Sequence, residues 1–179
     1  MALSTGFNKI KTAVFISGTG SNLKSLIKFS KIKKSPISIN LIISNNPKSK
    51  GLLYGKIFKI KKKIFDFKNR NLDEKKVLFE LNKNKIDLIC LAGFMKVLSK
   101  VFIKNFNGKI LNIHPSLLPK FKGLNTYERA ISKKEKFSGC TVHLVSSKLD
   151  SGKIILQKKV RINKEETAKT LAKKILTQE

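Results

Sequence analysis

Short apolar runs alternate along the chain with segments in which apolar and lysine residues follow a helical spacing. The apolar runs are rich in β-branched residues, which is typical of strands buried in a parallel sheet. We expect strands at residues 10–17, 37–43, 63–67, 86–91, 109–114, 140–145 and 153–160. The spacing between them predicts helices at residues 23–31, 73–83, 127–133 and 165–176. This alternation predicts one α/β domain over residues 1–179, with a Rossmann-like, open, mainly parallel sheet and helices on both faces.

The first candidate for chemistry is the loop between the first strand and the first helix. It consists of Gly18, Thr19, Gly20, Ser21 and Asn22. Two glycines allow backbone amides to approach a phosphate, and a helix N-terminus supplies positive potential. The spacing fits neither the nucleotide P-loop nor the dinucleotide fingerprint. The loop therefore predicts a cradle for a single phosphate group or, alternatively, a turn in which Ser21 or Asn22 caps the helix.

The second candidate lies at the end of the strand at 109–114. Asn112 and His114 are two residues apart, so their side chains share one face of the strand. Ligands of open α/β sheets bind beyond the carboxyl ends of the strands. An amide N–H beside an imidazole is suited to stabilise a developing oxyanion, so we expect a functional pair here rather than a packed core histidine.

The third candidate is Asp150, in an Asp-Ser-Gly sequence that also favours a simple turn. If this turn lies beside His114, its carboxylate favours the protonated imidazole. The other histidine, His143, alternates with apolar neighbours, and we interpret it as a supporting or packing residue.

The net charge is +28, from 39 basic and 11 acidic residues. Lysine and arginine side chains neutralise the phosphates of nucleic acids. A non-enzymatic, lysine-rich nucleic-acid-binding protein is therefore the rival hypothesis. Only three basic residues are arginine, and the lysines are spread over every segment without interleaved aromatic residues, which disfavours specific nucleic-acid binding. No acidic residue precedes Asp66, so the first part of the chain should attract anions such as phosphorylated metabolites.

The two cysteines, Cys90 and Cys140, form no CxxC motif, and the chain has only two histidines. We therefore expect no metal site and no disulfide, as suits a reducing cytoplasm. The apolar runs are shorter than the ~20 residues of a membrane span, so we expect no membrane association.

Five segments, in this order, resemble the formyltransferase family that uses 10-formyltetrahydrofolate. They are residues 16–23, 91–95, 112–119, 139–143 and 149–152, and the run Asn-Ile-His-Pro-Ser-Leu-Leu-Pro at 112–119 is the most specific. The resemblance implies the formyltransferase fold. It also implies a one-carbon transferase of de novo purine biosynthesis, which passes the formyl group of 10-formyltetrahydrofolate to the amine of glycinamide ribonucleotide.

The same resemblance implies roles for individual residues. Asn112, His114 and Asp150 would be the catalytic set. The loop at residues 18–22, called the phosphate loop below, and Glu179 would hold the ribonucleotide. The folate would be held by Arg70, Met95, Lys96, Val97, Leu98 and Asn112. The Leu118–Pro119 peptide bond would be cis. Relatives continue beyond the position of Glu179, so we expect this chain to lack their C-terminal segment.

Two relatives of the family share the Asn-x-His core. Methionyl-tRNA formyltransferase carries a C-terminal RNA-binding domain, for which this chain has no residues. A formyltetrahydrofolate deformylase-like hydrolase is the closer alternative, although that enzyme has an N-terminal regulatory domain. The phosphate loop favours a small phosphorylated substrate, and we expect a monomer or a homodimer.

Overall fold

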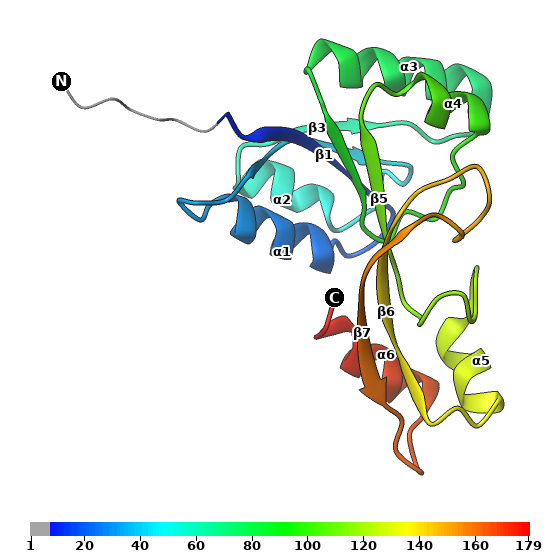
Figure 1. Ribbon diagram of the computed structural model, residues 1–179. Helices are drawn as coiled ribbons and strands as arrows, with labels where there is room; N and C mark the ends of the chain where they lie inside the picture. Colours follow the sequence, from blue (N-terminus) through cyan, green and yellow to red (C-terminus); the bar gives the residue numbers. More distant parts are fainter. Residues whose placement is uncertain (1–7) are drawn as a thin grey trace. The chain divides into compact units, whose positions relative to one another are not determined.

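The computed structural model describes residues 8–179, so the first seven residues of the predicted domain lie outside it. The described chain forms two compact units (Figure 1). Unit 1 contains the described residues up to Leu98 together with Asn105–Lys109, and unit 2 contains Ser99–Lys104 and Ile110–Glu179. The elements are, in chain order, β1 (Ile10–Ile16), α1 (Ser21–Ser30), β2 (Ile37–Ser44), α2 (Leu52–Ile57), β3 (Lys61–Ile64), α3 (Arg70–Lys83), β4 (Leu88–Leu91), α4 (Lys100–Asn105), β5 (Lys109–His114), α5 (Thr126–Ser132), β6 (Phe137–Leu144), β7 (Ile154–Arg161) and α6 (Ala168–Leu176).

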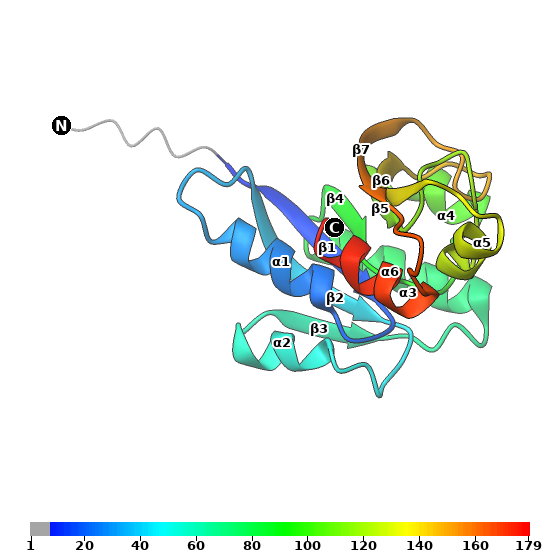
Figure 2. The same cartoon turned by 90° about the horizontal axis from the view of Figure 1, so that it is seen from below.

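Unit 1 contains an open parallel sheet with the strand order β3-β2-β1-β4. Helices α1 and α2 lie on one side of these strands and α3 lies on the other (Figure 1), and α1 and α2 face the viewer in Figure 2. The residues of β1 from Thr12 to Ile16 have no exposed surface, as expected for a central strand covered on both faces. The predicted α/β class, with a parallel sheet between two helical layers, is therefore confirmed.

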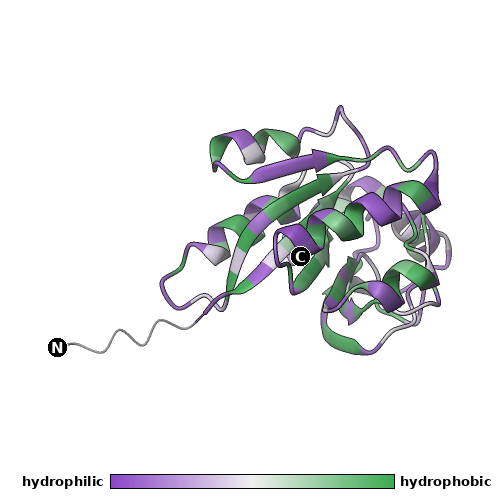
Figure 3. Cartoon of the chain, turned by 90° about the horizontal axis from the view of Figure 1, so that it is seen from above, coloured by the Kyte–Doolittle hydropathy of each residue, from purple (hydrophilic) through white to green (hydrophobic). Residues whose placement is uncertain are grey.

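The core of unit 1 explains why these segments fold in this way. Val14, Ile16 and Ile42 project from β1 and β2 against Leu23 and Ile27 of α1. These two helical residues are four apart, so they lie on the same face of α1. Figure 3 shows apolar stretches along the inner strands, an edge strand that is largely hydrophilic, and hydrophilic residues interspersed along the helices.

Unit 2 contains the strands β5, β6 and β7, which pair antiparallel in that order. Helices α5 and α6 pack against them through a cluster of buried residues, namely Ala130, Cys140, Val160, Leu171 and Ile175. The β5–β6 register places Asn112 opposite His143 and His114 opposite Thr141. Antiparallel pairing therefore brings residues of two sequence-distant segments into direct contact.

The structure corrects several predicted boundaries. Helices α2 and α4 were not predicted, because each has six residues and is too short to show a helical period. Strand β3 ends at Ile64 rather than at residue 67, where Phe67 has a left-handed backbone conformation (φ 57°). Helix α3 begins three residues earlier than expected, because the Asn69 side chain caps it by accepting from the amide of Leu72.

Three further observations bear on the sequence predictions. Within residues 8–179, no helix is both long and apolar enough to cross a membrane. The same residues contain no group of three or more His, Cys, Asp or Glu side chains placed to hold a metal ion. Cys90 and Cys140 are unbridged thiols, and burial raises the pKa of Cys90 to about 11.

Candidate active site

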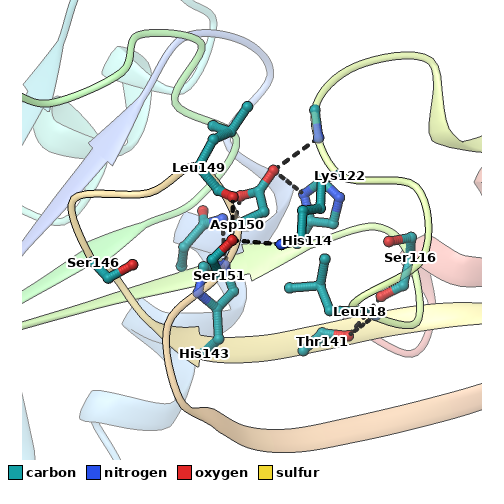
Figure 4. A network of polar contacts seen from close by, with 12 residues as sticks. His114, Ser116, Leu118, Lys122, Thr141, His143, Ser146, Leu149, Asp150 and Ser151 are labelled. Atoms are coloured by element: carbon teal, nitrogen blue, oxygen red, sulfur yellow. Dashed lines mark hydrogen bonds and ion pairs between the residues drawn. The ribbon is translucent and has the colours of Figure 1, made fainter.

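The structure brings His114, His143 and Asp150 together within unit 2 (Figure 4). His114 Nδ1 lies 3.5 Å from Asp150 Oδ2. Asn112 connects to the same carboxylate through His143, whose Nε2 is 3.1 Å from Asn112 Nδ2 and 3.7 Å from Asp150 Oδ1. The three residues of the predicted catalytic set therefore belong to one network of polar contacts.

The Asp150 carboxylate is placed by a tight turn between β6 and β7. Asp150 itself has a left-handed backbone conformation (φ 44°), which aspartate tolerates better than most residues. Two residues later, a Cβ atom on Gly152 would lie 1.7 Å from the carbonyl oxygen of Leu144. Only glycine allows the turn to approach the end of β6 this closely.

The surroundings of Asp150 keep its carboxyl group ionised. Burial opposes ionisation, but the contact with His143, the N–H of Gly123 at 2.9 Å and the charge of His114 outweigh it. The pKa of the Asp150 carboxyl is consequently lower than its ordinary value of 3.8. A negative charge is thus held against two imidazoles at neutral pH.

His114 has an oxygen acceptor at each ring nitrogen. Nδ1 faces the Asp150 carboxylate, and Nε2 lies 2.9 Å from the carbonyl oxygen of Phe121. A neutral imidazole carries one proton and would leave one of these acceptors facing a lone pair. A doubly protonated ring would donate to both acceptors.

His143 belongs to the same network, although the predicted catalytic set does not include it. Its side chain is buried, and Nδ1 lies 2.9 Å from the carbonyl oxygen of Leu144. The signal that would have identified it is the β5–β6 register, which places it opposite Asn112. That register depends on long-range pairing and is not readable from the local sequence.

The loop after β5 is held in place by Thr141 and Gln157. The Thr141 hydroxyl donates to the carbonyl of Ser116 at 2.6 Å and accepts from the amide of Leu118 at 3.1 Å. The Gln157 amide donates to the carbonyl of Leu118 at 2.9 Å. The Leu118–Pro119 peptide bond is cis, as the family resemblance implied.

In unit 1, the predicted phosphate loop leads directly into α1. The N-cap of α1 is Gly20, which has no side chain with which to cap the helix. The alternative prediction, a cap by Ser21 or Asn22, is therefore wrong. The first amides of a helix have no partners within the helix, and here they are suited to an anion.

Gly18 and Gly20 have different surroundings in this loop. The Gly18 carbonyl accepts from the Ser49 hydroxyl at 2.6 Å and from the Gly51 amide at 3.1 Å, whereas a Cβ atom on Gly18 would meet nothing within 4 Å. Gly20 has φ +76°, and a Cβ atom there would lie 2.7 Å from the Gly51 Cα. The fold itself therefore requires Gly20, whatever the loop binds.

The predicted folate segment follows β4 and contacts the end of β1. The Met95 amide donates to the Ser17 hydroxyl at 2.8 Å, and the Ser17 amide donates to the carbonyl of Gly93 at 3.1 Å. This segment and the phosphate loop therefore lie at the same edge of the unit 1 sheet, where β1 and β4 end. Met95, Lys96 and Val97 in this segment are exposed, whereas Leu98 is buried.

Arg70 and Glu179 are the remaining predicted binding residues. Arg70 begins α3, and its Nε donates to Glu74 Oε1 at 3.2 Å. The preceding loop reaches the folate segment through Phe67, whose ring packs edge-on against Phe94 at 5.5 Å. Glu179 follows α6 in unit 2, where burial together with the Glu179 charge raises the pKa of Tyr127 to about 12.

Comparisons with known proteins identify the family of this chain. Residues 10–179 match the model of the formyl transferase family. The chain is 42% identical over 172 residues to phosphoribosylglycinamide formyltransferase of Haemophilus influenzae. The aligned region covers 94% of this chain and 81% of that protein. It is also 41% identical over 170 residues to the human trifunctional purine biosynthetic protein adenosine-3, covering 93% of this chain but only 17% of the human protein.

Solved structures agree with the sequence comparison. The crystal structure of phosphoribosylglycinamide formyltransferase from Anaplasma phagocytophilum has 42% identity and a TM-score of 0.89, with 95% of this chain and 80% of that chain covered. The corresponding structure from Brucella melitensis has 40% identity and a TM-score of 0.90, with 96% and 90% covered. The resemblance seen in the five sequence segments is thereby confirmed, and the chain belongs to the formyl transferase family, among relatives that include the phosphoribosylglycinamide formyltransferases.

Proposed function

We propose that this chain transfers the formyl group of 10-formyltetrahydrofolate to the amine of glycinamide ribonucleotide. The observation that carries the proposal is the polar set formed by Asn112, His114 and Asp150, in which an imidazole faces a carboxylate beside a carboxamide donor. The relatives of comparable length carry this activity in their names, which supports the same assignment.

The reaction needs groups that stabilise negative charge on the formyl oxygen. The neutral amine attacks the formyl carbon, a new C–N bond forms, and the carbonyl oxygen becomes an oxyanion. Asn112 has two N–H groups, of which one faces His143, so the second is available to the oxyanion. His114 supplies the other donor when its Nε2–H exchanges the carbonyl of Phe121 for the oxyanion.

Collapse of the oxyanion breaks the bond between the formyl carbon and N10 of the folate. The amine loses one proton and N10 gains one, so the overall transfer is balanced. Asp150 keeps His114 charged through both steps, and it assists the proton transfer through water. Every charge that develops is met by a donor or a proton carrier of this chain.

In unit 1, the loop at residues 18–22 and the segment after β4 would hold parts of the two substrates. The residues fit them, because the first amides of α1 suit a phosphate and the exposed side chains of Met95 and Val97 offer apolar surface to a planar ring. Lys96, Leu98 and Arg70 would complete the folate site, and Glu179 would bind the ribose.

The decisive experiment is formyl transfer from 10-formyltetrahydrofolate to glycinamide ribonucleotide by the purified chain. We expect formylated ribonucleotide and tetrahydrofolate in equal amounts. Release of free formate without the ribonucleotide would identify a deformylase-like hydrolase instead. Salt-dependent binding to random DNA without any formyl transfer would support the nucleic-acid-binding alternative.

A Gly18→Val variant tests the phosphate loop without disturbing the fold. A side chain at Gly18 projects into open space, so we expect unchanged thermal unfolding. Branched bulk beside the first helical amides should keep the phosphate away and raise the KM for glycinamide ribonucleotide by about tenfold or more, equivalent to ~1.4 kcal/mol of lost binding.

The control for this variant is Lys33→Ala, which removes one exposed lysine from outside the loop. Diffuse steering by such a lysine is screened over ~8 Å at physiological ionic strength, so its KM should stay close to that of the unchanged protein. A larger KM effect from Lys33→Ala than from Gly18→Val, in steady-state kinetics at two salt concentrations, would assign phosphate binding to the basic surface.

A further inference from the structure

The hydrogen bonds of His143 define its tautomer. A backbone carbonyl only accepts hydrogen bonds, so the 2.9 Å contact with Leu144 places the proton of the imidazole on Nδ1. The Asp150 Oδ1 atom is 3.7 Å from Nε2, which is longer than a hydrogen bond. The Gly123 amide donates to Asp150 Oδ2 and His114 faces the same oxygen, so the carboxylate has a donor and a facing imidazole without a proton on His143 Nε2. In the neutral ring, Nε2 carries a lone pair.

This lone pair determines which way the Asn112 carboxamide points. Nε2 lies 3.1 Å from Asn112 Nδ2, so the NH₂ group donates to it. Turning the carboxamide by 180° would put its oxygen against the lone pair, which loses the hydrogen bond and adds a repulsion. His143 itself cannot turn to accommodate the flip, because it is 2% exposed and bonded to Leu144.

We propose that His143 is a positioning residue: its neutral Nε2 selects the carboxamide orientation in which Asn112 keeps an N–H for the substrate oxyanion. The inference rests on the proposed function, in which Asn112 is an oxyanion donor. In the opposite orientation a carboxamide oxygen would take the place of the donor and repel the developing charge. His143 acts through Asn112 and does not contact the substrate.

Two substitutions separate the two nitrogens of His143. In His143→Gln, the terminal amide reaches the position of Nε2, where its oxygen can accept from Asn112. In His143→Asn, the shorter amide reaches only the position of Nδ1, so it can donate to Leu144 but leaves Asn112 without its partner. Both variants place a carboxamide at the same buried position, so a difference between them reports on the contact with Asn112 rather than on stability.

We expect His143→Asn to lower kcat about tenfold with little change in either KM, as one lost orienting hydrogen bond would. His143→Gln should retain kcat to within about threefold. In an Asn112→Ala background, the further loss caused by His143→Asn should be much smaller, because its main route to the reaction is already removed. Equal losses in the two single variants, or an additive loss in the double variant, would overturn the proposal.

A second measurement does not depend on activity. Long-range ¹H–¹⁵N correlation spectra of histidine-labelled protein report which ring nitrogen carries the proton. We expect a protonated Nδ1 and an unprotonated Nε2 at His143, with the proton pattern changing in Asn112→Asp, where a carboxylate replaces the donor. A protonated Nε2 in the unchanged protein would overturn the positioning of Asn112 whatever the activity, whereas absence of formyl transfer by the unchanged protein would overturn the proposed function.

Discussion

Replacing Asp150 by asparagine is expected to lower kcat by about 10³–10⁴-fold while the chain still folds. The carboxylate is 3.5 Å from His114 Nδ1, and the second ring nitrogen faces the carbonyl of Phe121. An asparagine amide can donate to Nδ1, which would hold His114 neutral and remove the charge from the proposed oxyanion donor. An analogous exchange at the carboxylate of the serine-protease triad has an effect of this size, because the histidine tautomer changes.

The control is Glu135→Gln, which removes a carboxylate outside the candidate site. Glu135 Oε1 forms a salt bridge with Nζ of the exposed Lys120 at 2.9 Å. Loss of this surface salt bridge should leave kcat close to that of the unchanged protein. Steady-state kinetics of both variants, with the KM values determined separately, measures the difference. An Asp150→Asn variant within tenfold of the unchanged kcat would exclude Asp150 from the catalytic set.

Asp150→Asn is also expected to change how the stability of the fold depends on pH. The pKa of the Asp150 carboxyl is lowered in the folded state, so the ionised group stabilises the fold above the unfolded pKa of about 3.9. This contribution is lost as the pH falls through the lower folded value. The unchanged protein should therefore lose more stability than Asp150→Asn between about pH 6 and about pH 3, as measured by urea unfolding.

A Gly152→Ala variant is expected to show the second large effect, on stability and activity together. The added Cβ would lie 1.7 Å from the Leu144 carbonyl oxygen, so the turn must move away from the end of β6. Overpacking against rigid backbone costs about 3 kcal/mol. The displaced turn also carries Asp150 away from His114, so kcat should fall by about 10² or more.

Ser147→Ala is the matched control, because it lies in the same connection, is exposed and adds no atoms. Its free energy of unfolding should change by no more than about 0.5 kcal/mol. Urea unfolding and kinetics of both variants give the comparison. If Gly152→Ala matches Ser147→Ala in stability and turnover, the close approach of this turn to β6 does not constrain the site.

The sequence alone predicted the α/β class and most of its elements, because these depend on local patterns. Buried parallel strands contain continuous apolar runs, such as residues 13–16 of β1, and the longer helices show a helical spacing. The two-residue spacing of Asn112 and His114 also placed both side chains on one face, since alternation is a local property of a strand. Helices α2 and α4 were not predicted, because six residues make fewer than two helical turns and show no helical period.

The tertiary structure decided which side chains meet at the candidate site. His143 contacts Asn112 because β6 pairs antiparallel with β5 in one register, and a shift by a single residue would turn His143 to the other face. The Asp150 carboxylate reaches His114 because a glycine allows the turn to approach β6, and Gly20 is required by its approach to Gly51. Pairing and close approach depend on contacts between segments far apart in the chain, whereas the pattern of one segment records only its own secondary structure and the face that it buries.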